Sequence, residues 1–203
     1  MTTRAELKQR TREALLYAAL EEFAEHGLDG PSLDQICARA GKTRGAFYVH
    51  FADREALIIA VVERILAEYL DALVIASAQA DGLVAAIELF ADLLLQASRG
   101  DAPDLGEFAV LGTVHFRFVL EAGARIPGAS EVFGRVIHAG IQMLAPTIQQ
   151  GQAAGSVRSD LPPADIGHLT ITILLGVLVL QQGKIEARVE NVRDTLIRLL
   201  ELP

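Results

Sequence analysis

Residues 32–51 read SLDQICARAGKTRGAFYVHF, which has the spacing of two short helices joined by a glycine turn. Ser32 is placed to cap the first helix while Gln35 reaches back toward it, as in a capping box. Gly41 falls where a left-handed residue turns the chain, and Thr43 is a suitable N-cap for the second helix. Because such a helix-turn-helix reads the major groove of DNA, the sequence predicts a DNA-binding segment.

The apolar residues of this stretch predict a buried face. Leu33, Ile36 and Ala40 recur at the helical spacing, so they share one side of the first helix. Phe47 and Phe51 are expected to lock the second helix onto the core. The residues left facing outward are hydrogen-bond donors and a flat ring beside a glycine, groups that suit phosphates and base edges: Lys42, Arg44, Gly45, Tyr48 and His50.

The stretch continues into FYVHFADREAL, residues 47–57, which resembles the TetR family of bacterial regulators. In that family a Tyr-x-His-Phe run is followed by a basic-acidic pair that opens a long helix. The resemblance covers the first fifty-odd residues, with 10–26 as a supporting helix, and it weakens beyond Leu57. A smaller echo at 151–163, with Gly-x-x-x-Gly-x-x-Arg-x-Asp and a proline pair, looks like the link before the family's dimerising helices.

The resemblance implies a DNA contact at each matching position. Helix capping and phosphate binding are compatible for Ser32 and Thr43, since a hydroxyl can do both. Lys42 stands where the family is usually apolar, and it either adds a phosphate contact or is merely solvated. Val49 replaces a larger polar or aromatic residue, and it touches a thymine methyl or nothing. The implied phosphate contacts are Ser32, Thr43, Tyr48, His50 and Arg54, and the implied base contacts are Arg44 and Gly45.

The charge is uneven along the 203 residues, whose formal net charge is −8. Through Arg54 the eight basic residues equal the eight acidic ones, so the remainder carries the whole excess. We expect Arg39, Lys42, Arg44 and Arg54 to form a positive face. The acidic remainder of the chain after Arg54, which we call the body, is expected to repel DNA. One cysteine gives neither an intramolecular disulfide nor a multi-cysteine zinc site, and no cofactor is predicted.

The start, Met-Thr-Thr-Arg, lacks an apolar signal region, so we expect a cytoplasmic protein. The longest apolar run, 169–180, is far short of the ~20 residues that cross a bilayer, which argues against a membrane span. Apolar residues recur at helical spacing and nothing alternates like a strand, so the fold is predicted to be all-α. We predict a helix-turn-helix domain over 1–54 and a helical ligand-binding and dimerisation domain over 55–203, with helices over 53–79, 83–98, 105–122, 130–154, 164–182 and 188–200.

The segment 164–182 is apolar nearly all round, so it needs two surfaces to pack against. One is the protein's own bundle, and the other, as the resemblance implies, is the same helix of a second subunit. A buried core helix is the alternative. A twofold dimer would place its two helix-turn-helix segments on DNA half-sites that are one helical turn apart. The predicted dimer interface is Leu169, Ile173, Gly176, Val177, Leu180, Val189, Val192, Leu196 and Leu199.

The resemblance also implies a pocket for a small molecule between the helices of the body. An aromatic stripe at helical spacing is more often ordinary core, and His115 is either a ligand donor or a satisfied core histidine. Arg117 and Arg125 could attract an anionic group, although solvated arginines are commoner. The predicted ligand-binding residues are Phe90, Leu94, Leu111, His115, Phe118, Met143 and Thr172.

These features predict a ligand-responsive transcriptional regulator, and specifically a repressor that binds a palindromic operator as a dimer and is released by a small, largely apolar ligand. An enzyme is the competing class, but the sequence has no Glu-x-x-His pair, Gly-x-Ser-x-Gly or phosphate-cradling loop. The other alternative is a helical small-molecule-binding protein without operator-specific DNA binding, which DNA affinity would separate from a regulator.

Overall fold

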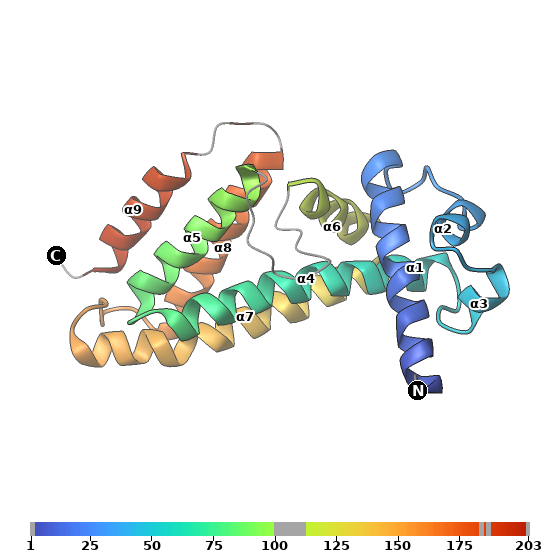
Figure 1. The fold of residues 1–203 in the computed structure, drawn as a ribbon. Helices are drawn as coiled ribbons and strands as arrows, with labels where there is room; N and C mark the ends of the chain where they lie inside the picture. The colour runs from blue at the N-terminus through green and yellow to red at the C-terminus, as the bar shows by residue number, and fades with distance from the viewer. Residues whose placement is uncertain (1–2, 100–112, 183–184, 186–187, 202–203) are drawn as a thin grey trace. The chain divides into compact units, whose positions relative to one another are not determined.

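The computed structural model describes residues 3–99, 113–182, 185 and 188–201, and every regular element in that part of the chain is a helix (Figure 1). This confirms the predicted all-α class. Of the expected helix 105–122, residues 105–112 lie outside the described residues. The helices are α1 (Arg4–His26), α2 (Leu33–Arg39), α3 (Arg44–Tyr48), α4 (Arg54–Gln79), α5 (Leu83–Arg99), α6 (Thr113–Arg125), α7 (Pro127–Ala154), α8 (Pro163–Gln182) and α9 (Val189–Leu200).

Two helices begin several residues earlier than the sequence predicted. The first begins at Arg4 because Thr3 caps it: the Thr3 hydroxyl accepts from the Glu6 N–H at 3.2 Å, and the Glu6 carboxylate accepts from the Thr3 N–H at 2.7 Å. The seventh begins at Pro127, since proline is well tolerated in a first helical turn, where its missing N–H is not needed.

The contacts divide the chain into two compact units. The reader unit comprises Met1–Ile65 and Arg117–Phe133, and the body unit comprises Leu66–Phe116 and Gly134–Pro203. Helices α4, α6 and α7 therefore contribute residues to both units. A division into domains at residue 54 stays a prediction.

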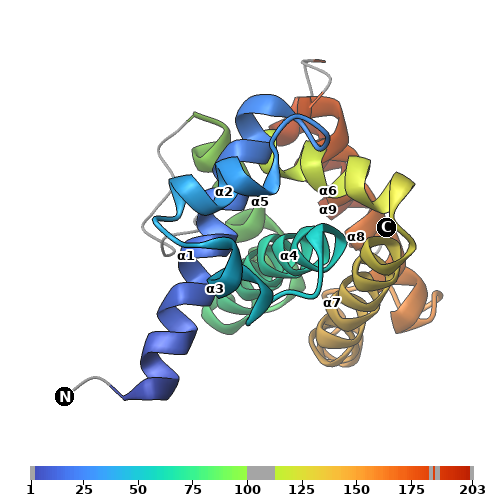
Figure 2. The same cartoon turned by 90° about the vertical axis from the view of Figure 1, so that its right-hand side faces the viewer.

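The reader unit is built around a three-helix core in which α2 and α3 pack beside α1 (Figure 2). Its buried side chains come from all three helices, from the link after α3 and from the start of α4: Leu15, Leu16, Ile36, Phe47, Phe51 and Leu57. Helix α6 joins this core from its middle, because the ring of Phe118 stacks on that of Phe23 with centroids 5.0 Å apart. A helix distant in sequence thus completes the reader.

In the body unit, α9 packs against α5 and α8 (Figure 1). Ala91, Val177 and Val189 form a buried cluster there. The link before α8 is tied to the end of α9, since Arg158 donates from its backbone N–H to the Leu200 carbonyl at 2.8 Å and from its guanidinium to the Leu199 carbonyl at 3.1 Å. A cation at a helix C-terminus also interacts favourably with the negative end of the helix dipole.

Helix α8 is the apolar segment that sequence reasoning singled out. By length and composition alone, Pro163–Leu180 passes as a candidate membrane span. Packing explains part of its composition, because Ile166, Val177 and Leu178 are buried within the body unit, whereas Leu169 and Leu180 lie on an exposed side. We therefore interpret α8 as a packing helix of the body.

Candidate nucleic-acid interface

The helix-turn-helix is fixed by local hydrogen bonds that the sequence predicted. The Gln35 N–H donates to the Ser32 hydroxyl at 3.2 Å, and the Ser32 N–H donates to the Gln35 side chain at 2.7 Å, which completes a capping box. The turn residue Gly41 has a φ of +63°, a left-handed conformation that glycine adopts at no steric cost. The Thr43 hydroxyl caps α3 by accepting from the Ala46 N–H at 3.2 Å.

Phe47 anchors α3 and thereby sets which residues face outward. Its side chain is 0% exposed, and its ring lies 5.4 Å from that of Phe51. The next two residues, Tyr48 and Val49, are 54% and 64% exposed and therefore face solvent. An exposed tyrosine and valine beside a buried phenylalanine give α3 a face that is free to enter a groove.

The structure brings the other predicted DNA contacts onto this segment. Lys42 and His50 are half-buried at its two ends, and the remaining predicted residues of α2 and α3 are exposed: Ser32, Thr43, Arg44, Gly45 and Tyr48. All of these contacts to DNA stay predictions.

Arg44 forms a weak, exposed ion pair with Asp34. Its Nη1 lies 3.3 Å from the Asp34 carboxylate, and the two side chains are 56% and 68% exposed, so water screens the pair. The pKa of the guanidinium is raised by Tyr48 and then by Asp34. Arg44 is thus oriented by its neighbours and remains accessible to an acceptor on a base or a phosphate.

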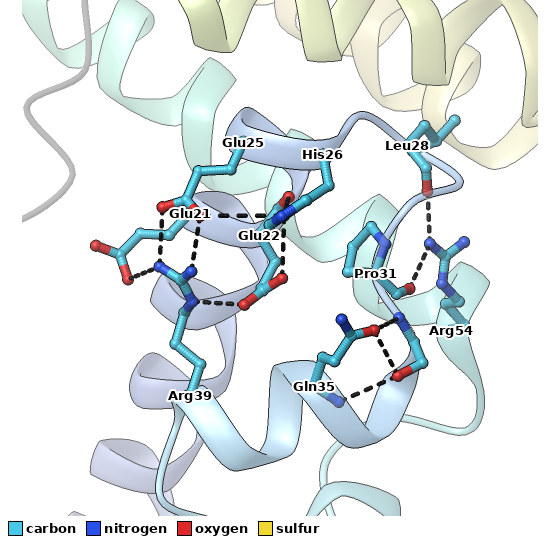
Figure 3. A network of polar contacts seen from close by, with 10 residues as sticks. Glu21, Glu22, Glu25, His26, Leu28, Pro31, Gln35, Arg39 and Arg54 are labelled. Atoms are coloured by element: carbon cyan, nitrogen blue, oxygen red, sulfur yellow. Dashed lines mark hydrogen bonds and ion pairs between the residues drawn. The ribbon is translucent and has the colours of Figure 1, made fainter.

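Arg39 does not join the positive face, and that expectation is wrong. Its guanidinium donates to three carboxylates of α1, at 2.6 Å to Glu22, 2.8 Å to Glu25 and 3.3 Å to Glu21 (Figure 3). These bonds raise the pKa of Arg39, with Glu25 as the largest cause. The physical reason is that the packing of α2 on α1 places the arginine against three carboxylates, which neutralise its positive charge.

Arg54 is engaged inside the reader unit. Its Nη2 donates to the carbonyls of Leu28 and Pro31 (Figure 3), and its guanidinium lies over the Phe23 ring at 5.3 Å. These contacts fasten the link between α1 and α2. The implied phosphate contact of Arg54 stays a prediction, and the cations of the expected positive face that remain accessible on α3 and its turn are Lys42 and Arg44.

Sequence reasoning missed a groove beside α3. The groove, of about 750 Å³, lies between the first turns of α1 and the end of α3, and its lining includes Arg4, Lys8 and His50. Only the packing of α1 on α3 brings these residues together. The spacing of Arg4, Lys8 and Thr11 along one helical face was the available signal.

The predicted ligand-binding residues are dispersed. Phe118 is a core residue of the reader unit, where it stacks on Phe23. Within the body unit Phe90 is buried, Met143 is half-buried and Thr172 is exposed. Leu111 and the side chains of Leu94 and His115 lie outside the described residues. The ligand pocket therefore stays a prediction.

The two arginines considered for an anionic group both lie in the reader unit. Arg117 is exposed. Arg125 pairs with Asp29 at 2.8 Å and with Glu121 at 3.1 Å. The Asp29 pair joins the end of α6 to the link that follows α1, and because its side chains are 44% and 72% exposed, water screens it.

The predicted dimer residues fall into two groups. Val177, Val189 and Leu196 are buried within the protomer, while Ile173 and Val192 are half-buried. The others are exposed: Leu169, Gly176 and Leu180 form a stripe along α8, and Leu199 lies on α9. A dimer stays a prediction, and the exposed stripe is the part of the predicted interface that a second copy could reach.

Comparison with known proteins agrees with the fold and with the helix-turn-helix. Residues 15–61 match the family described as bacterial regulatory proteins, tetR family. The chain is 42% identical over 59 residues to YvdT, an uncharacterized HTH-type transcriptional regulator of Bacillus subtilis (strain 168), which covers 29% of this chain and 30% of YvdT. It is 42% identical over 62 residues to BepR, an HTH-type transcriptional repressor of Brucella suis biovar 1 (strain 1330). The aligned segment covers 30% of this chain and 29% of BepR.

The matched segment spans less than a third of the length of these two relatives, and both are named as transcriptional regulators, the class that the sequence predicted in preference to an enzyme. The fold extends the likeness to nearly the whole chain. SmeT in complex with triclosan superposes with a TM-score of 0.71 at 22% identity, covering 95% of this chain and 92% of SmeT. Residues 15–61 therefore carry the segment that defines the tetR family of bacterial regulatory proteins, and the chain as a whole has the fold of SmeT.

Proposed function

We propose that the protein is a cytoplasmic transcriptional repressor that binds a palindromic DNA operator as a homodimer and leaves it when a small, largely apolar effector binds the body. The observation that carries this proposal is the exposed face of α3. Arg44, Gly45 and Tyr48 project from a short helix that is capped by Thr43 and anchored by Phe47. Such a helix can enter the major groove with donors directed at base edges.

The test is selection of bound duplexes from a random DNA library by the purified protein at moderate salt. We expect enrichment of a palindrome whose half-sites are separated by about one helical turn, because a twofold dimer presents two readers. No enrichment would contradict the proposal and favour a helical small-molecule-binding protein without operator-specific DNA binding.

Replacing Arg44 with alanine should weaken binding to the selected palindrome about ten- to a hundredfold at each half-site, the range for losing one good base contact. Fluorescence anisotropy with the labelled palindrome measures this loss. Arg198→Ala is the matched control, since Arg198 is exposed on α9 in the body unit. Equal affinities for the two variants would exclude Arg44 as a contact.

The shared helices support the effector part of the proposal. Because α4, α6 and α7 each contribute to both units, a rearrangement in the body unit has a continuous path to the reader unit. The Arg125–Asp29 pair connects the end of α6 to the link that follows α1. A ligand that changes the position of α6 would therefore act on the segment between α1 and α2.

An effector that weakens DNA binding a hundredfold must prefer the DNA-free protein by about 2.7 kcal/mol, and DNA must weaken effector binding by the same factor. Triclosan, which SmeT binds in the complex above, is the first compound to titrate. We expect its dissociation constant to rise about a hundredfold when the palindrome is present. If triclosan binds equally with and without the palindrome, release by this compound is wrong.

A further inference from the structure

The groove between α1 and α3 has open apolar walls and basic polar groups. Leu7 and Val49 line it and are 55% and 64% exposed, values that place two large aliphatic side chains in contact with water. Its charged and titratable lining residues are Arg4, Lys8 and His50, and all three are basic. The groove is thus suited to an anionic ligand with an apolar part.

Arg4 and Lys8 differ from three of the arginines elsewhere in the reader unit. Arg39, Arg44 and Arg125 each pair with a carboxylate. Within the described part of the chain, neither Arg4 nor Lys8 forms an ion pair. Their positive charge is therefore available to a ligand.

His50 lies at the other side of the groove and responds to the same charges. Burial lowers the pKa of its imidazole, and the positive charges of Lys8 and Arg12 lower it further. Both cations that face His50 come from α1, and Arg12 also lies over the Phe51 ring at 5.4 Å. An anion placed between His50 and Lys8 would offset this repulsion.

We propose that the groove seats one phosphate and sugar of the DNA backbone, held by Arg4 and Lys8, and that His50 takes up a proton as the phosphate arrives. This inference rests on the proposed function, because a helix in the major groove has a phosphate backbone beside it. The deoxyribose would contact Leu7 and Val49. The protonated imidazole would donate a charge-assisted hydrogen bond to a phosphate oxygen.

The sign of the pH dependence follows from these charges. In the free protein the pKa of His50 lies below its ordinary value, so the imidazole is mostly neutral at neutral pH. A bound phosphate stabilises the charged form and raises the pKa. DNA binding therefore takes up a proton, and affinity falls as the pH rises from the free pKa through the bound pKa.

Salt dependence tests the phosphate contact. Anisotropy is measured with the selected palindrome and with a duplex of about 30 base pairs of mixed sequence, at several salt concentrations. Lys8→Gln should weaken binding to both duplexes and reduce the slope of log K against log salt by about one. Arg10→Gln is the matched control, because Arg10 is exposed on α1 but does not line the groove. Equal slopes for the two variants would overturn the proposal.

The proton is tested with the same duplexes between about pH 5.5 and 8, the range in which histidine titrates. Wild-type affinity should fall as the pH rises, and His50→Gln should flatten that dependence. His138→Gln, which changes an exposed histidine of α7, should preserve it. A His50→Gln variant that keeps the wild-type pH dependence would refute proton uptake at this site.

A measurement without DNA guards against a folding defect. In the free protein, NMR titration of His50 should show a higher pKa in Lys8→Gln than in wild type, since one repulsive charge is gone. The two proposals also fail separately. If wild type binds the palindrome no more tightly than the mixed duplex, the proposed function is wrong, while the salt slopes on the mixed duplex still decide whether the groove holds a phosphate.

Discussion

Replacing Gly176 with arginine is expected to convert the protein to a monomer and to weaken binding to the selected palindrome about 10²–10⁴-fold, the range gained by linking two binding modules. Gly176 is exposed in the middle of the α8 stripe. A Cβ built on it meets nothing within 4 Å, so the new side chain clears its own protomer. In the proposed dimer the same side chain would press a charge into the apolar face of a second copy.

Gly134→Arg is the matched control, because Gly134 is also exposed on a helix of the body unit with open space around its Cβ. Light scattering after size-exclusion chromatography gives the mass, and anisotropy gives the affinity. A Gly176→Arg protein that remains dimeric would place the interface elsewhere. A monomer that binds the palindrome as wild type does would show that one reader suffices.

The parts of the reader that sequence reasoning predicted correctly depend on near neighbours. The Ser32 capping box, the left-handed Gly41 and the Thr43 cap each involve residues within a few positions of one another, and the predicted packing of Phe47 into the core is confirmed. Local geometry fixes such features whatever the rest of the chain does.

The features that were missed depend on residues far apart in the chain. Arg39 belongs to a basic cluster in the sequence, but its partner Glu22 lies 17 positions earlier on another helix. Arg125 and Asp29 are 96 positions apart. A charge pattern shows which residues are charged but not which charges the fold will neutralise.

The body shows a different limit. An apolar helix such as α8 offers no polar face from which to read its orientation, so the sequence could not separate positions that pack inside the protomer from those that remain exposed. Val177 belongs to the first group and Gly176, its neighbour, to the second. One residue turns a helix by about 100°, which is enough to move from the core to the surface.

Replacing Phe47 with alanine should destabilise the reader unit by about 3–5 kcal/mol, the usual cost of removing a buried aromatic ring and leaving a cavity. Phe47 is 0% exposed and contacts the rings of Tyr48 and Phe51. The five residues of α3 are too few to form a stable helix alone, so its position depends on this ring. We expect the variant to lose operator binding together with the ordering of α3.

Hydrogen exchange resolves this effect better than a single unfolding curve, because a chain with two compact units need not unfold in one step. Amides of α2 and α3 should exchange about a hundredfold faster or more in Phe47→Ala, as a loss of about 3 kcal/mol or more implies. Amides of α8 should be unchanged. Val49→Ala is the control, since its side chain is 64% exposed and its removal should change stability by less than about 0.5 kcal/mol. If the amides of α3 exchange at the same rate in Phe47→Ala and in Val49→Ala, a contact other than the Phe47 ring holds α3 in place.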